Sequence, residues 1–142
     1  MMNIDKIPVP QGKYLAAVRH ESIVYTSGMT PRKAGKLLYS GKIKTDDVLE
    51  SHRDALHLAT LNALGAVQNC LKAAEKISVV LQMSVFLNAE ENFTKHAKIA
   101  DFASEFLIDF LGIKSVGTRA AIGVASLPSN ATVEVTLVCK ID

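Results

Sequence analysis

The sequence predicts a layered α/β protein in which two helices cover one face of a mixed β-sheet. Two long segments have the periodicity of amphipathic helices, and the segments around them alternate or are rich in β-branched residues. Glycine, proline and polar residues separate these segments. The predicted order is two or three strands, a helix, a strand, a second helix and two strands. At 142 residues, the chain is expected to form a single domain over residues 1–142.

The N-terminal part of the chain is typical of short strands. Residues 14–27, YLAAVRHESIVYTS, read as two strands around a polar turn at His20 and Glu21. Residues 33–43, KAGKLLYSGKI, are a second candidate hairpin, punctuated by glycine.

A long helical pattern follows over residues 46–76, with Thr45 as its expected N-cap. Its small side chains fall largely on one face, which predicts close packing against a sheet. That face comprises Val48, His52, Ala55, Ala59, Ala66, Cys70 and Ala73. A second helix is expected from Asn92, as its cap, to Leu111, with Gly112 ending it. Its predicted buried stripe is Ile99, Phe102, Phe106 and Phe110.

The remaining strands lie between and after the helices. Residues 77–87 alternate between apolar and mixed positions, as a strand does. Residues 117–135, GTRAAIGVASLPSNATVEV, read as two strands joined by a polar turn. In the last strand one face is fully apolar, and the other, which carries Glu134, is polar until Val138.

Composition argues against several classes of protein. A net charge of +2, from 16 basic and 14 acidic residues, gives no strong field for nucleic acid or an anionic membrane. The most hydrophobic stretch, residues 77–87, is too short to span a bilayer. The first 14 residues contain acid and proline where a secretion signal would have an apolar run. Because the two cysteines, Cys70 and Cys139, also have apolar neighbours, we expect a cytoplasmic protein.

Arg119 and Glu134 stand out because each is a lone charge among small and branched apolar residues. A guanidinium can bind a carboxylate or phosphate through two parallel hydrogen bonds, and it stays charged at physiological pH. A carboxylate on a strand can orient or deprotonate a water molecule. Taken singly, each residue is most simply explained as a surface charge.

The expected hairpin would keep these two charges apart. With the turn near Ser129, Glu134 lies opposite Val124, about 17 Å along the strand from Arg119 at roughly 3.3 Å per residue. The side chains would meet only through a bulge, for which Gly123 is the candidate, or across the edge of a neighbouring subunit. Helices on one face also leave the other face of the sheet open, and covering it with copies of the chain would make a symmetric oligomer.

Other catalytic patterns are weak. The four histidines lack the spacing of metal ligands, and neither cysteine has the electropositive setting of a reactive thiolate. No metal or cofactor is therefore expected. Residues 32–44 hold five basic residues and no acidic one. They could contact phosphates, but a solvated basic hairpin is the simpler interpretation, and a nucleic-acid partner is not expected.

The sequence resembles the RidA/YjgF family of reactive intermediate deaminases, also described as L-PSP-type endoribonucleases. The most specific part is a C-terminal motif of arginine, Leu-Pro and Val-Glu, which here comprises Arg119, Leu127, Pro128, Val133 and Glu134. Upstream, GKY at residues 12–14 is similar to the family's GPY, and YTSGMTP at residues 25–31 is similar to its TSGQ-x-P strand end. The resemblance covers nearly the whole chain and looks closer to a longer, less characterised branch.

This resemblance implies a chorismate mutase-like α/β fold and a homotrimer with a site in each of three clefts between subunits. In the family, the arginine binds the carboxylate of a 2-imino acid, and the glutamate orients the water that attacks the C=N carbon. The products are a 2-keto acid and ammonia, formed without metal or cofactor. Carried over, Arg119 and Glu134 are the catalytic pair. The implied substrate-binding residues are Tyr14, Ser27, Gly28, Asp101 and Ala121.

The chain departs from the family pattern at a few positions. Asp101 stands where asparagine is usual, and its charge would repel a carboxylate if it faced the site. Ala120 and Ala121 replace a Ser-Cys pair, while Lys13 and Met29 replace a proline and a glutamine. The resemblance therefore implies a deaminase of small 2-imino acids. Two alternatives stay open: a regulatory protein that binds small carboxylates without turnover, and an endoribonuclease acting on mRNA.

Overall fold

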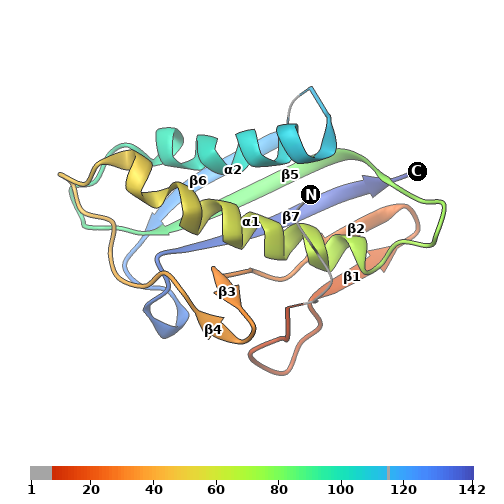
Figure 1. The fold of residues 1–142 in the computed structure, drawn as a ribbon, viewed down its shortest axis with the longest axis horizontal. Coiled ribbons are helices and arrows are strands. Elements are labelled where there is room, and N and C mark those ends of the chain that lie inside the picture. The colour runs from red at the N-terminus through yellow and green to blue at the C-terminus, as the bar shows by residue number, and fades with distance from the viewer. Residues whose placement is uncertain (1–7, 115) are drawn as a thin grey trace.

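The computed structural model describes residues 8–114 and 116–142, in which two helices pack on a five-stranded sheet (Figure 1). The expectation that the first residues form no secretion signal lies partly outside the described residues, because it includes residues 1–7. The elements are β1 (Ala17–His20), β2 (Ile23–Thr26), β3 (Arg32–Lys33), β4 (Lys36–Leu37), α1 (Arg53–Gln68), β5 (Ile77–Asn88), α2 (His96–Leu111), β6 (Thr118–Val124) and β7 (Val133–Ile141).

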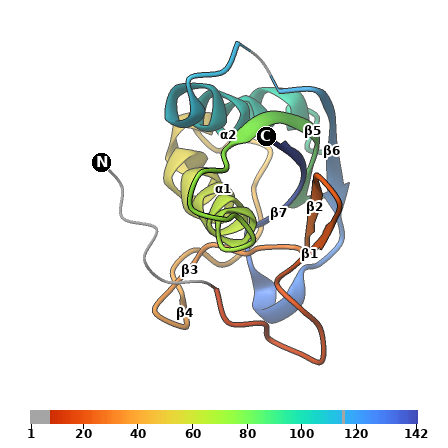
Figure 2. The same cartoon turned by 90° about the vertical axis from the view of Figure 1, so that its right-hand side faces the viewer.

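The predicted layered architecture is confirmed. The main sheet has the strand order β1-β2-β7-β5-β6, and β3 pairs with β4 in a separate two-stranded ribbon. Only the β5–β6 pair of the main sheet is parallel. Seen along the sheet, α1 and α2 lie on the same side of it (Figure 2). The opposite face is not covered by either helix.

The predicted hairpin of residues 117–135 is wrong. Strand β6 pairs in parallel with β5, and β7 pairs antiparallel with the other edge of β5, so β5 lies between them. The cause is the crossover from β5 through α2 to β6, which places two parallel strands side by side. Residues 125–132 then carry the chain past the end of β5 to β7.

Helix α1 is shorter than its sequence pattern. A 3-10 turn at Leu49–His52 precedes it, and residues 69–76 lie outside the helix, so the predicted extent of 46–76 and the cap at Thr45 are wrong. Asp47 instead accepts a hydrogen bond from the backbone N–H of Lys44 at 2.8 Å, which favours a turn there. The predicted members Ala55, Ala59 and Ala66 are buried, as is Ala63, which was not predicted, whereas Val48 is exposed.

Helix α2 begins four residues after the predicted cap and ends where predicted. Lys95 occupies the N-cap position, and Gly112 ends the helix in the left-handed conformation with φ of 66°. Glycine adopts this conformation without steric cost. Of the predicted stripe, Ile99 and Phe106 are buried, while Phe102 and Phe110 are partly buried against the core.

The core lies between the two helices and the sheet. Alternate residues of β5 and β7 point into it, and the fully buried pair Met83 and Leu137 face each other across the ladder. The intervening residues of both strands point to the open face, because successive side chains of a strand alternate. This alternation determines where each predicted site residue lies. Among the described residues, no helix has the length and apolar character that a membrane span requires.

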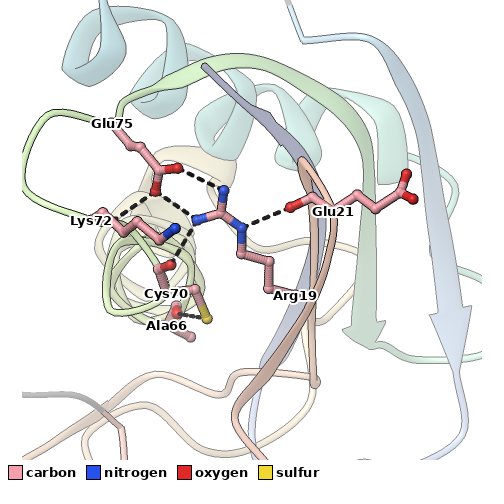
Figure 3. Close-up of polar contacts among 6 residues, drawn as sticks. All are labelled: Arg19, Glu21, Ala66, Cys70, Lys72 and Glu75. Carbon is pink, nitrogen blue, oxygen red and sulfur yellow. Dashed lines mark hydrogen bonds and ion pairs between the residues drawn. The ribbon is translucent and has the colours of Figure 1, made fainter.

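The sheet edge at β1 is fastened to the turn that follows α1 (Figure 3). Arg19 binds both carboxylate oxygens of Glu75, at 2.6 and 2.7 Å, and donates to the backbone oxygens of Cys70 and Glu21. The backbone N–H of Lys72 also donates to Glu75, at 2.7 Å. These contacts join residues that lie 56 positions apart in the chain.

Candidate functional site

Glu134 is the second residue of β7 and points to the open face of the sheet. It lies opposite Phe86 of β5, while its neighbours Val133 and Val135 are fully buried on the helix side. The side chain of Glu134 is partly buried, and this burial raises the pKa of its carboxyl group. A carboxyl group with a raised pKa is better suited to exchange protons near neutral pH than an ordinary surface glutamate.

Gly28 lets the chain pass directly over the Glu134 carboxylate. Reciprocal backbone hydrogen bonds of 2.9 Å between Met29 and Val135 hold the segment after β2 against β7. A Cβ atom on Gly28 would lie 2.6 Å from Cδ of Glu134. Any larger residue would therefore displace the carboxylate, and the backbone around residue 28 forms one wall beside it.

The predicted residues Ser27 and Tyr14 belong to the same region of the chain. The Ser27 hydroxyl donates to the backbone oxygen of Leu15 at 2.6 Å, which ties the segment before β1 to the end of β2. The Tyr14 side chain is 48% exposed, and its hydroxyl accepts a hydrogen bond from the Gln11 backbone. Glu134, Gly28 and Ser27 thus form one group of neighbouring residues, to which Tyr14 is connected through the chain.

Arg119 lies on the other face. It is the second residue of β6 and pairs with Met83, whose side chain is fully buried under the helices. Its guanidinium reaches α2, where Nη1 donates to Oδ1 of Asp101 at 2.7 Å and to Oγ of Ser104 at 2.9 Å. Nη2 donates to the backbone oxygen of Ala97 at 3.2 Å. The Arg119 side chain keeps 23% of its surface exposed.

Ala121 follows Arg119 on the same face of β6 and packs against the core. Strand β6 is an edge strand, so one side of its backbone has no strand partner among the described residues. Its hydrogen-bonding groups are available to a ligand or to another chain. Arg119, Asp101 and Ala121 therefore form a second group, on the β6 edge and α2.

Within one chain these two groups do not meet. Arg119 is level with Met83 and Glu134 with Phe86, on strands that flank β5. Strands β6 and β7 are two strand spacings apart, and the two residues are offset by three positions along the strands. Their Cα atoms are therefore roughly 14 Å apart, and their side chains lie on opposite faces of the sheet.

Of the two ways in which Arg119 and Glu134 could meet, a bulge at Gly123 is not formed. The ladder from Thr118 to Val124 is regular, and the irregularities of the sheet lie in β5, between Ile77 and Val79 and between Val80 and Gln82. Gly123 instead accommodates α2: a Cβ atom there would lie 2.5 Å from Nε2 of His96. A bulge therefore does not bring Arg119 and Glu134 together.

The sequence patterns did not point to three further side chains near these groups. Ser104 binds Arg119 and lies one helical turn after Asp101, a spacing that places both on one face of α2. Phe86 and Ile122 share the open face with Glu134, and Ile122 is 43% exposed. The alternation of β5 and β6 would have indicated this face, but not that the strands are neighbours.

The surroundings of Cys139 disfavour its thiolate form. Cys139 is fully buried, and burial raises the pKa of its thiol to about 12, so the thiolate is not formed near neutral pH. Over residues 8–114 and 116–142, no three side chains of histidine, cysteine, aspartate or glutamate gather as a metal ion would require.

A model of the family described as YjgF/chorismate mutase-like, putative endoribonuclease matches residues 2–141. Protein TCP17 of Trypanosoma cruzi is 27% identical over 128 residues, which are 89% of this chain and 79% of that protein.

Two solved structures share the fold closely. One is Atu1372 from Agrobacterium tumefaciens, described as of unknown function, with a TM-score of 0.84, 29% identity, and coverage of 94% of this chain and 86% of that one. The other is a putative endoribonuclease from Shewanella oneidensis MR-1, with a TM-score of 0.86, 27% identity, and coverage of 98% and 92%.

Proposed function

We propose a function from the premise that the chain belongs to the YjgF/chorismate mutase-like family. The protein hydrolyses small 2-imino acids to 2-keto acids and ammonia, at sites formed between subunits. Arg119 binds the substrate carboxylate, and Glu134 orients and deprotonates water. The observation that carries this proposal is the partly buried carboxylate of Glu134, held against the Gly28 backbone with a raised pKa.

The reaction needs little beyond orientation and one proton carrier. The substrate is the protonated imine. Glu134 takes a proton from water as the water oxygen bonds to the C=N carbon, and the π electrons move to nitrogen, which becomes a neutral amine. Glu134 returns that proton to the amine, which makes an ammonium leaving group. As the C–N bond breaks and ammonia departs, the hydroxyl group gives its proton to Glu134 and becomes the carbonyl. General acid–base catalysis of this kind contributes about 10²- to 10⁴-fold in rate.

Arg119 is suited to bind the substrate carboxylate because it lies on an edge strand and carries a positive charge. Its guanidinium is hydrogen-bonded to α2, and β6 is an edge strand that another chain can approach. A charge-assisted hydrogen bond to a carboxylate contributes about 1.5–3 kcal/mol. The proposed site consequently depends on Arg119 for affinity and on Glu134 for turnover.

A trimeric assembly would bring the two groups together. Arg119 and Glu134 lie on opposite faces of one sheet, so a shared site requires Arg119 of one subunit and Glu134 of its neighbour. The open face also carries apolar side chains on three strands, with Val18 51%, Tyr25 51% and Ile122 43% exposed. Covering such a surface with other copies of the chain is favourable and gives a closed symmetric oligomer.

The proposal is tested by ammonia release from 2-imino acids that an amino-acid oxidase generates in the same vessel. Wild-type protein should accelerate release above the spontaneous rate. Glu134→Gln should lower kcat about 10²- to 10⁴-fold. Arg119→Ala should raise KM about 10- to 100-fold, from the loss of its charged hydrogen bonds. Glu91→Gln, an exposed glutamate outside both groups, is the matched control and should behave as wild type.

RNA cleavage, which the family description names, would use the basic segment 32–44. Two of its cations already make contacts within the chain: Arg32 donates to Ser129 at 3.2 Å, and Lys42 donates to Asn88 at 3.1 Å. The same preparations should be incubated with RNA. No acceleration on any imine, with RNA cleavage that is lost in Lys33→Ala/Lys36→Ala, would replace the deaminase with a nuclease.

A further inference from the structure

The carboxylate of Asp101 is hydrogen-bonded to the guanidinium of Arg119, which is the group proposed to bind the substrate carboxylate. Its Oδ1 lies 2.7 Å from Nη1 of Arg119, and Oγ of Ser104 lies 2.9 Å from the same nitrogen. A guanidinium Nη carries two hydrogens, so these two acceptors account for both. One end of the Arg119 fork is therefore filled by α2 before any ligand arrives.

We propose that Asp101 is a specificity-determining residue that weakens the binding of anionic ligands at Arg119. A ligand carboxylate must either displace Asp101 from Nη1 or bind the rest of the fork beside an existing negative charge. Displacement costs the ion pair for any ligand that takes Nη1, whereas repulsion from Asp101 acts only on anions, so a neutral ligand bound to the rest of the fork meets no charge penalty. This inference rests on the proposed role of Arg119 in the deaminase site.

The exposure of the pair indicates how large the effect is. The Asp101 side chain is 57% exposed and that of Arg119 is 23% exposed, so the ion pair is well solvated. Solvated ion pairs of this kind contribute little, equivalent to at most about a fivefold change in an equilibrium constant. Repulsion between Asp101 and a carboxylate a few ångströms away adds a penalty of similar size. The combined effect on anion affinity is about three- to tenfold.

A purely structural role for Asp101 predicts the opposite result. If its contact only held Arg119 in a productive orientation, removing its charge would loosen the guanidinium and weaken anion binding. Asparagine separates the two possibilities, because it keeps an oxygen that can accept from Nη1 and removes the charge. The sign of the change in affinity therefore identifies the role.

The experiment measures the dissociation constants of 2-oxobutanoate and of its neutral amide, 2-oxobutanamide, by ligand-observed NMR on the full chain. Asp101→Asn should tighten 2-oxobutanoate binding about three- to tenfold and change 2-oxobutanamide binding less than twofold. Asp109→Asn, an exposed acid further along α2, removes the same charge elsewhere and should change neither constant.

Arg119→Ala separates failure of the inference from failure of the proposed function. If Arg119→Ala abolishes 2-oxobutanoate binding but Asp101→Asn leaves it unchanged or weaker, the role of Asp101 is overturned and the arginine keeps its role. If 2-oxobutanoate binds equally well to wild type and Arg119→Ala, the proposed carboxylate site itself is wrong and the inference falls with it. Equal tightening of both ligands would show a general change in the site rather than discrimination by charge.

Discussion

The carboxylate of Glu134 is held where its negative charge is disfavoured. It lies beside Phe86 and against the backbone of Gly28, and burial raises its pKa above the usual 4.5. Folding therefore favours the protonated form of this group. The resulting cost to stability is fully present above the folded-state pKa, and it disappears as the pH falls below the unfolded-state pKa.

Glu134→Gln should consequently stabilise the protein while it removes activity. The glutamine has no charge to desolvate, so its Tm should exceed that of wild type at pH 7, and the difference should shrink as the pH falls toward 4. Thermal unfolding of both proteins between pH 4 and 8 measures this. Glu91→Gln, at an exposed position, should show no such pH-dependent difference. A lower Tm for Glu134→Gln at pH 7 would mean that the carboxylate stabilises the fold.

At the scale of secondary-structure elements, β1 is an edge strand of only four residues, and the Arg19–Glu75 pair holds it to the turn after α1. The Arg19 guanidinium and the Lys72 backbone N–H hold the pKa of Glu75 down at about 2. A lowered carboxyl pKa stabilises the fold above the unfolded value of 4.5, and this contribution is lost as the pH falls from there through about 2.

Glu75→Gln should therefore lower the Tm at pH 7, and the loss relative to wild type should vanish as the pH approaches 2. Because the pair fastens β1, hydrogen exchange of the β1 and β2 amides should accelerate more than that of β5. Glu90→Gln is the control on another turn, since its carboxylate accepts one backbone hydrogen bond, from Thr45, and Glu90 forms no ion pair among the described residues. An unchanged exchange pattern would show that the pair does not hold the edge.

The sequence predicted on which face of the sheet most strand side chains lie, but it did not predict which strands pair with each other. Alternation along β7 correctly put Glu134 on the face opposite its buried neighbours. It did not show that β5 would lie between β6 and β7, because periodicity carries no information on pairing partners. The Asp101–Arg119 contact was missed for the same reason: it joins a helix and a strand whose relative placement depends on that crossover.

For the whole molecule, the decisive question is whether one subunit supplies Arg119 and another Glu134. The proposed assembly has three times the 15.3 kDa mass of one chain, which sedimentation equilibrium measures directly. Tyr25 lies 51% exposed on the open face, so Tyr25→Glu should weaken the assembly by placing a charge in a desolvated interface. A monomeric wild-type protein at micromolar concentration would remove the basis for a shared site.

Mixed assemblies test the shared site itself. At substrate concentrations well below KM, Arg119→Ala and Glu134→Gln chains should each show little activity, but equal amounts refolded together should recover roughly a quarter of wild-type deaminase activity. This fraction is the chance that one subunit keeps its arginine while the neighbour keeps its glutamate. If each site lay within one chain, every site would lack one of the two residues, and mixing would restore nothing. Two preparations mixed without refolding provide the control, because their subunits have not been exchanged.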